Sequence, residues 1–171
     1  VDGRVSIFLE PIALYMTKDL HEAGDGGWLT TYPAPEQAMV LGEGRLYNED
    51  ADDLVIFSYG NGVPMSLRAA RSIEAKHGWK VRVVDRRWLV PLNETFIAEQ
   101  ARSAKRILIV DEGRHSAGVG EGVITAIAEA GFGGRPFQRV VGVDTYTPLA
   151  GAAFLVLPGD DDIVAAAGRL G

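Results

Sequence analysis

The sequence contains no cysteine among its 171 residues. Disulfides, thiolate zinc sites and cysteine nucleophiles are therefore excluded. Long apolar runs are also missing, and none approaches the roughly 18 residues that a membrane-spanning helix needs. No secretory signal pattern opens the chain. From these absences we expect a protein without a membrane association, most simply a bacterial cytoplasmic one.

Basic residues are outnumbered: 17 lysines and arginines stand against 23 aspartates and glutamates, which gives a formal net charge of −6 at pH 7. A chain with this charge is a poor partner for a phosphate backbone, so we expect no general nucleic-acid binding. The hydrophobic fraction of 47% and the charged fraction of 23% are ordinary for a globular protein. The length fits one domain, or one domain with a piece of another.

The chain becomes regular after residue 53. Short, continuous apolar runs typical of buried strands occupy residues 54–57, 81–84, 107–110 and 139–141. Segments with apolar residues on one helical face follow the first three runs. Asn93 is a suitable N-cap for the second of them, and the three aspartates 160–162 suit the start of a last helix. This alternation predicts an α/β fold, a three-layer sandwich around a mostly parallel sheet.

The first third of the chain follows no such pattern. Residues 5–9 form an apolar run that predicts a buried strand, and Glu10-Pro11 predicts a turn after it. Residues 17–37 have no periodicity and contain several glycines and prolines, which predicts a linker at a domain boundary. A strand is expected within residues 38–46.

Two glycine motifs invite a cofactor interpretation. Gly60-Asn61-Gly62 lies between a predicted strand and helix, where a turn can cradle a phosphate, but Met65 occupies the position of a third glycine. A tight strand-to-helix turn is the simpler interpretation. Gly24-Asp25-Gly26 resembles the magnesium motif of thiamine-diphosphate enzymes, yet no apolar strand precedes it. We therefore expect no metal site there. Gly118-x-Gly120 is expected to allow close packing of a helix on the sheet.

Polar residues follow the predicted strands, at the sheet edge where ligands and partners of such folds bind. Arg87 follows one strand and Glu112 another, so the two could form a bidentate ion pair if those strands are neighbours. Two separately solvated charges are the alternative. Asp111, Arg114 and His115 complete the cluster, which could serve acid–base chemistry but fits the polar rim of a subunit contact better. These five residues are the structural or docking candidates.

Several segments in order resemble a known family. They are SIFLEPIALY (6–15), LVIFSYGNGV (54–63), VRVVDRRWLVPLNETFI (81–97), ILIVDEGRHSAGVGEGV (107–123) and RVVGVDTYTP (139–148). Together they resemble the C-terminal part of the beta subunit of the first component of 2-oxo acid dehydrogenase complexes, which carries a transketolase-like C-terminal domain. The resemblance implies a remnant of the pyrimidine-binding domain in residues 1–16, a linker in 17–37 and the transketolase-like domain in 38–171.

For the complete enzyme the resemblance implies thiamine diphosphate and magnesium, and oxidative decarboxylation with acyl transfer to lipoyl-lysine. The thiamine-binding motif and the activating glutamate of the family lie in parts that this sequence does not contain, so no cofactor-binding or catalytic residue is expected here and the chain alone should be inactive. Its implied role is assembly and docking. The implied partners are the rest of the same enzyme, a second copy, and the lipoyl acyltransferase component.

The sequence departs from the family pattern at Asp111, where a histidine is usual, and at Arg135, which stands near the usual place of an acidic residue that helps to capture the acyltransferase. The segment 150–158 is also unusually apolar and glycine-rich. Two other interpretations stay open. The chain could be the corresponding domain of a transketolase or deoxyxylulose-phosphate synthase, or a small nucleotide- or phosphate-binding α/β module that uses residues 60–62.

Overall fold

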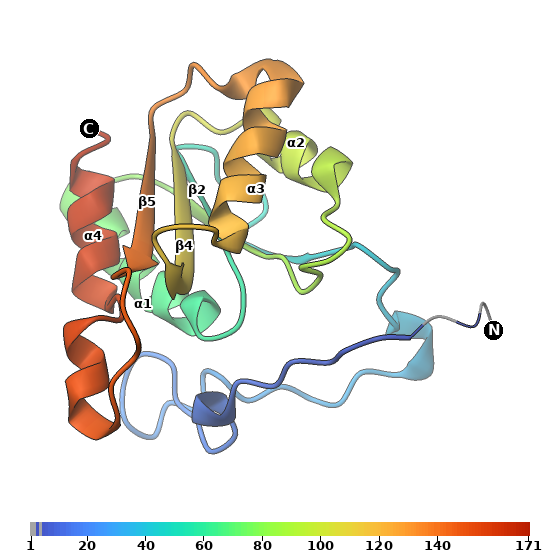
Figure 1. The fold of residues 1–171 in the computed structure, drawn as a ribbon, viewed down its shortest axis with the longest axis vertical. Helices are drawn as coiled ribbons and strands as arrows, with labels where there is room; N and C mark the ends of the chain where they lie inside the picture. Colours follow the sequence, from blue (N-terminus) through green and yellow to red (C-terminus); the bar gives the residue numbers. More distant parts are fainter. Residues whose placement is uncertain (1–2, 4) are drawn as a thin grey trace.

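The structure, a computed structural model, describes Gly3 and residues 5–171 (Figure 1). Residues 1, 2 and 4, at the start of the expected remnant 1–16, lie outside the described residues. The strands are β1 (Arg45–Tyr47), β2 (Leu54–Ser58), β3 (Val81–Asp85), β4 (Ile107–Arg114) and β5 (Phe137–Gly142). The α-helices are α1 (Gly62–His77), α2 (Glu94–Arg102), α3 (Val119–Ile127) and α4 (Asp160–Gly168). Short helical turns are η1 (Ile12–Leu14), η2 (Pro35–Gln37), η3 (Ala128–Phe132) and η4 (Ala150–Leu155).

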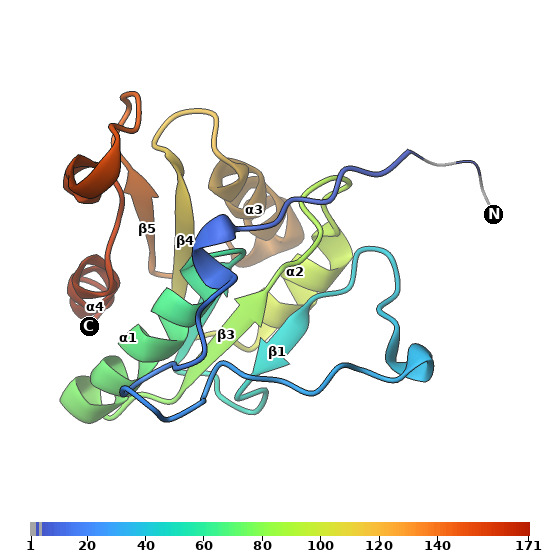
Figure 2. The same ribbon diagram turned by 90° about the horizontal axis from the view of Figure 1, so that it is seen from below.

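The five strands form one sheet in the order β1-β3-β2-β4-β5. Strand β1 pairs antiparallel with β3, and the other neighbouring pairs are parallel. Helices α1 and α4 cover one face, and α2 and α3 cover the other (Figures 1 and 2). The predicted α/β sandwich with a mostly parallel sheet is confirmed. Continuous apolar strands indicate this arrangement because both of their faces are buried.

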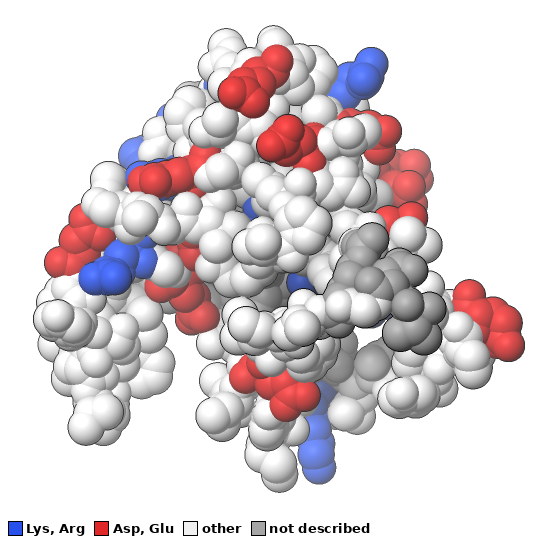
Figure 3. All heavy atoms as spheres, turned by 45° about the vertical axis from the view of Figure 1, so that its right-hand side comes forward, with Lys and Arg blue, Asp and Glu red and all other residues white. Residues whose placement is uncertain are grey.

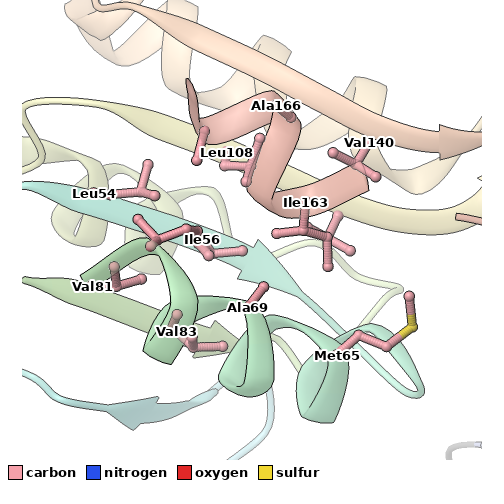
Figure 4. Packing of buried hydrophobic residues seen from close by; sticks show 14 of the residues in the cluster. Leu54, Ile56, Met65, Ala69, Val81, Val83, Leu108, Val140, Ile163 and Ala166 are labelled. Carbon is pink, nitrogen blue, oxygen red and sulfur yellow. The ribbon is translucent and has the colours of Figure 1, made fainter. Parts of the chain in front are cut away.

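Each face of the sheet has its own core. The larger cluster joins β2, β3 and β4 to α1 and α4, and its central members are fully buried (Figure 4). The side chains that meet there include Leu54, Ile56, Val83, Leu108 and Ile163. The second cluster places Phe57, Val84 and Ile109 against α2 and α3. Alternate residues of one strand thus serve opposite cores, as the period of two requires.

The helix ends agree with the signals in the sequence. The Asn93 side chain accepts a hydrogen bond from the Phe96 amide at 3.0 Å, so it caps α2 as expected. Helix α1 ends at Gly78, whose φ of 69° is the left-handed conformation that favours glycine. Three aspartates lie in the first turn of α4. No helix in the described part of the chain is long and apolar enough to cross a membrane.

Three local expectations are corrected. Residues 5–9 are extended but pair with no strand among the described residues, so the predicted strand is wrong. Of the strand expected in 38–46, only Arg45 and Leu46 lie in a strand, the short β1 at the sheet edge. Strand β4 does not end at Val110: it runs to Arg114 through an irregular register between Asp111 and Arg114. An apolar run alone cannot supply the partner backbone that a strand needs.

Candidate functional site

The candidate site lies at the carboxyl edge of β2, β3 and β4. The expected ion pair between Arg87 and Glu112 is not among the salt bridges of the described residues. Strand β2 lies between β3 and β4, so the two side chains follow strands that are not neighbours. Arg87 instead donates from Nε to Asp85 Oδ2 at 3.1 Å, and its Nη1 also contacts the Met39 sulfur. The pairing prediction is therefore wrong.

The inward-facing arginine of this loop is Arg86. It is only 4% exposed, and its guanidinium lies 5.7 Å from the centre of the Tyr59 ring. Burial lowers the pKa of Arg86 to about 10, although the negative charges of Asp111 and Asp85 oppose the shift. The Arg86 amide bonds the Ser58 carbonyl at 2.9 Å, which continues the strand ladder. No local signal distinguishes Arg86 from Arg87, because Val83 and Val84 are both buried and the period of two continues from each of them.

Asp111 is the buried junction of this edge. Its carboxylate accepts hydrogen bonds from the Tyr59 hydroxyl at 2.6 Å, the Gly113 amide at 2.7 Å and the Gly120 amide at 2.8 Å. It thereby ties the end of β2 to β4 and to the start of α3. Burial and the bond to Asp111 raise the pKa of Tyr59, which keeps its hydroxyl protonated as the donor.

The glycines at the start of α3 have the packing role that was expected. A Cβ at Gly120 would lie 3.1 Å from the Ile109 side chain and 3.3 Å from Asp111 Oδ2. A Cβ at Gly118 would lie 2.9 Å from Asp111 Oδ2. These glycines let the helix approach the sheet closely enough for its backbone to bond Asp111.

Glu112 lies half-buried beside Asn61. Burial raises the pKa of Glu112, and the neighbouring Asp111 charge acts in the same direction, while the Asn61 amide opposes the shift. The side-chain oxygen of Asn61, Oδ1, is buried and has no hydrogen-bond partner among the described residues. The pair stands where the loops after β2 and β4 meet.

We expect Glu112→Gln to stabilise the protein at neutral pH. A raised pKa in the folded state means that the ionised carboxylate disfavours folding, so stability falls as the pH rises from the ordinary glutamate pKa through the folded one. Glutamine removes that loss. Urea unfolding at several pH values should show a gain near pH 7 that vanishes at acidic pH. The control Glu99→Gln, on α2, should change stability by less than about 0.5 kcal/mol throughout; an equal gain in both variants would contradict the assignment.

Arg114 and His115 are exposed at the β5 side of the same edge. His115 Nε2 lies 3.2 Å from Arg139 Nη2, and Arg139 also lies 3.6 Å from Glu121. The next residue, Ser116, donates its amide and hydroxyl to Asp144 at 2.9 and 2.6 Å. The candidates Asp111, Glu112, Arg114 and His115 are thus gathered along one loop, with Arg87 apart. No nucleophile with an adjacent base is formed by them.

The amides at the start of α1, directly after the turn at residues 60 and 61, are already engaged in hydrogen bonds. The amides of Gly62 and Val63 bond the carbonyls of Tyr59 and Gly60, and Pro64 has no N–H to offer. The Met65 amide bonds the Asn61 carbonyl. Pro11 also covers the turn, because its ring would lie 3.5 Å from a Cβ at Gly60. The geometry therefore favours the tight-turn interpretation.

Gly24-Asp25-Gly26 belongs to a closed loop and does not fit a magnesium ion. The Asp25 carboxylate accepts four backbone hydrogen bonds of 2.7 to 2.9 Å, from the amides of residues 20, 21, 22 and 27. These bonds lower the pKa of Asp25 and occupy both of its oxygens. No cluster of three or more metal-ligating side chains occurs in the described part of the chain. The Asp25 carboxylate therefore does not fit a magnesium ion at this loop.

Two apolar strips flank the same edge. The N-terminal strip consists of the exposed side chains Val5, Ile7, Phe8, Leu9, Ile12, Tyr15 and Met16. The C-terminal strip consists of Val143, Tyr146, Leu149, Phe154 and Leu155. The segments that carry them, 5–16 and 143–158, contain only Glu10 and Asp144 as charged residues. Figure 3 shows a largely uncharged lobe at the lower left of the molecule, and a hollow separates it from a second lobe that carries acidic and basic side chains.

The fold and its sequence define the class of this chain: it belongs to the family described as "Transketolase, C-terminal domain", which matches residues 42–160. Within that family it is related to beta subunits of 2-oxo acid dehydrogenases. It is 31% identical over 134 residues to the pyruvate dehydrogenase E1 component subunit beta of Staphylococcus aureus, an alignment that covers 77% of this chain and 41% of the relative.

It is also 32% identical over 155 residues to the 3-methyl-2-oxobutanoate dehydrogenase subunit beta of Mycobacterium tuberculosis, covering 88% of this chain and 42% of the relative. The chain thus spans about two-fifths of the length of these relatives. A solved structure described as "Split gene transketolase, inactive beta4 tetramer" is similar with a TM-score of 0.68 and 23% identity, over 83% of this chain and 45% of that one. That likeness concerns the fold alone.

Proposed function

We propose that this chain is the C-terminal domain of the decarboxylating first component of a 2-oxo acid dehydrogenase complex, and that it serves subunit assembly and docking without thiamine chemistry of its own. Residues 38–171 form the domain, 17–37 the connection, and 1–16 the end of the preceding domain. The observation that carries the proposal is the pair of apolar strips at the carboxyl edge. Exposed apolar surface of this extent marks an interaction site.

The polar residues between the strips support a docking rim more than an active site. The Asp111 carboxylate already accepts three hydrogen bonds, and Arg114 and His115 are exposed. An interface usually combines apolar contacts with charged and polar side chains beside them. The named relatives are both dehydrogenase beta subunits, which favours this assignment over a transketolase or synthase. A phosphate-binding module receives no support from the turn at 60–62.

Arg135 disfavours docking of the acyltransferase component. It stands near the place where the family usually has an acidic residue that helps to bind this component. Arg135 Nη2 donates to the Arg102 carbonyl at 2.5 Å, and its guanidinium lies 4.9 Å from the centre of the Phe132 ring. The residue therefore caps the C-terminal end of α2 and places a positive charge there. The proposed docking surface is the carboxyl edge of the sheet, with the preceding domain and a second copy as its first partners.

The assembly role is tested by the association of the chain itself. We expect the chain to form dimers or larger species in sedimentation velocity, because the strips have no cover within one molecule. Phe8→Asp and Phe154→Asp should each shift the distribution toward monomer, since an aspartate cannot be buried unpaired in an apolar contact. The control Val40→Asp replaces an exposed apolar residue outside both strips and should leave the distribution unchanged. A monomeric chain at all concentrations would count against the proposal.

Thiamine diphosphate with magnesium should not bind to the chain. The Asp25 carboxylate is fully engaged, and the amides at the start of α1 are occupied. Titration calorimetry should therefore give no saturable heat, and no decarboxylation of pyruvate or branched 2-oxo acids should be detected. Saturable binding at micromolar concentration would show that the residues present form a cofactor site after all.

A further inference from the structure

A hollow of about 300 Å³ lies on the α1 face of the sheet, away from the carboxyl edge. Its walls and floor come from four parts of the chain: β1 with the residue after it, the middle of α1, the start of β3, and the loop before Trp28. The residues that line it are His21, Tyr47, Asn48, Leu67, Ala70, Arg71, Glu74, Val81 and Val83. The volume is in the range of small-molecule sites.

The loop that closes this hollow is held in shape. Asp25 accepts the four backbone amides described above, and Asp19 accepts those of Gly24 and Gly26 at 2.8 and 2.9 Å. The Trp28 amide bonds the Lys18 carbonyl at 3.0 Å, and the Trp28 ring packs against the larger core. The opposite wall is a four-turn helix and the floor is buried strand. The hollow is therefore preformed, as ligand sites usually are.

Glu74 and Asn48 both bond the backbone of Val81, which lies in the floor of the hollow. Glu74 Oε1 accepts the Val81 amide at 3.3 Å, and Asn48 Nδ2 donates to the Val81 carbonyl at 3.0 Å. Each of the two side chains thus uses one polar atom to form a hydrogen bond with the backbone of Val81. The second carboxylate oxygen of Glu74 and the amide oxygen of Asn48 form no hydrogen bond with any described residue and can receive donors from a ligand.

The positively charged side chain of Arg71 comes from α1, about one helical turn before Glu74. Arg71 precedes Glu74 by three residues on α1, a spacing that puts side chains on the same helical face about 5–6 Å apart between Cβ atoms. The two form no ion pair with each other in the described structure. Arg71 reaches Glu22 of the loop only at 3.4 Å, and both side chains of that pair are largely exposed. Its remaining N–H groups can therefore bind an anion.

We propose that this hollow binds a free α-amino acid with an apolar side chain. Arg71 takes the carboxylate, Glu74 and Asn48 take the ammonium group, and the hydrocarbon part lies on Leu67, Ala70 and Val83. An arginine and a glutamate about one helical turn apart, beside an apolar floor, match the two charged ends of a zwitterion. The site is independent of the assembly role, because it uses none of the residues of the carboxyl edge.

The test is a titration of the full chain with L-leucine, followed by amide chemical shifts in NMR spectra and by calorimetry. We expect saturable shifts at residues that line the hollow, with a dissociation constant in the millimolar range or below. 4-Methylpentanoate lacks the ammonium group and 3-methylbutylamine lacks the carboxylate, so each should bind at least about tenfold more weakly, since a charge-assisted hydrogen bond is lost.

Two variants separate the charges without removing the fold. Arg71→Gln should weaken leucine binding by about tenfold or more, and so should Glu74→Gln, which keeps an oxygen for the Val81 amide. Arg169→Gln, an exposed arginine after α4, is the control and should bind as the unchanged chain does. Absent shifts at millimolar leucine, equal binding of 4-methylpentanoate, or indifference to both substitutions would each overturn the proposal.

Discussion

Asp111→Ala is expected to lower the free energy of unfolding by about 3 kcal/mol or more. The carboxylate is buried and receives three donors, so its loss leaves the Tyr59 hydroxyl and the Gly113 and Gly120 amides without their acceptor. The bond of the Gly120 amide is buried and the other two are part-buried, and a buried donor left unpaired costs on the order of 1–3 kcal/mol. Urea unfolding followed by tryptophan fluorescence measures the change.

Asp144→Ala is the matched control for this effect. Asp144 also follows a strand and also accepts a backbone amide, that of Ser116, but it is exposed. Water can replace its hydrogen bonds, so the loss should stay near or below about 1 kcal/mol. If the two substitutions cost the same, Asp111 would not be the buried junction described here. Asp111→Asn should also be costly, since the amide nitrogen of asparagine cannot accept a hydrogen bond from a backbone N–H.

Leu108→Ala should cost about 2–5 kcal/mol. Leu108 is fully buried in β4, between the neighbouring strands and the face covered by α1 and α4 (Figure 4). Truncation removes apolar contacts and leaves a cavity that packed strands cannot close. The same change at Leu29, which is 64% exposed and lies outside both apolar strips, should alter stability by less than about 0.5 kcal/mol. A small loss at position 108 would mean that the core rearranges around the cavity.

Local signals predicted the elements well because each is produced by neighbouring residues. The run at 107–110 is a strand, Asn93 caps a helix, and Gly78 ends one. The clustering of Asp111, Glu112, Arg114 and His115 was also predictable, since a loop that follows a strand holds its residues together. The buried role of Asp111 could not be read from the sequence, because its donors come from Tyr59 and Gly120 on other elements.

The predicted pairing of Arg87 with Glu112 is wrong because local signals do not give the order of the strands in the sheet. A crossover from β3 to β4 can place the new strand on either side of the sheet, and here it passes over β2. Consecutive strands are neighbours only in about two-thirds of cases. The burial of Arg86 in place of Arg87 follows from the same fact, since the ladder with β2 continues through the Arg86 amide and sets which side chain turns inward.

The sequence by itself therefore determined the class of fold, the positions of most helices and strands, and the family, because periodicity, caps and motif order are properties of contiguous residues. Only the tertiary structure decided the strand order, the partners of the charged side chains, the unpaired state of residues 5–9 and the hollow beside α1. Each of these depends on contacts between residues far apart in the chain, and such contacts are selected by packing and by the burial of hydrogen-bonding groups over the whole molecule.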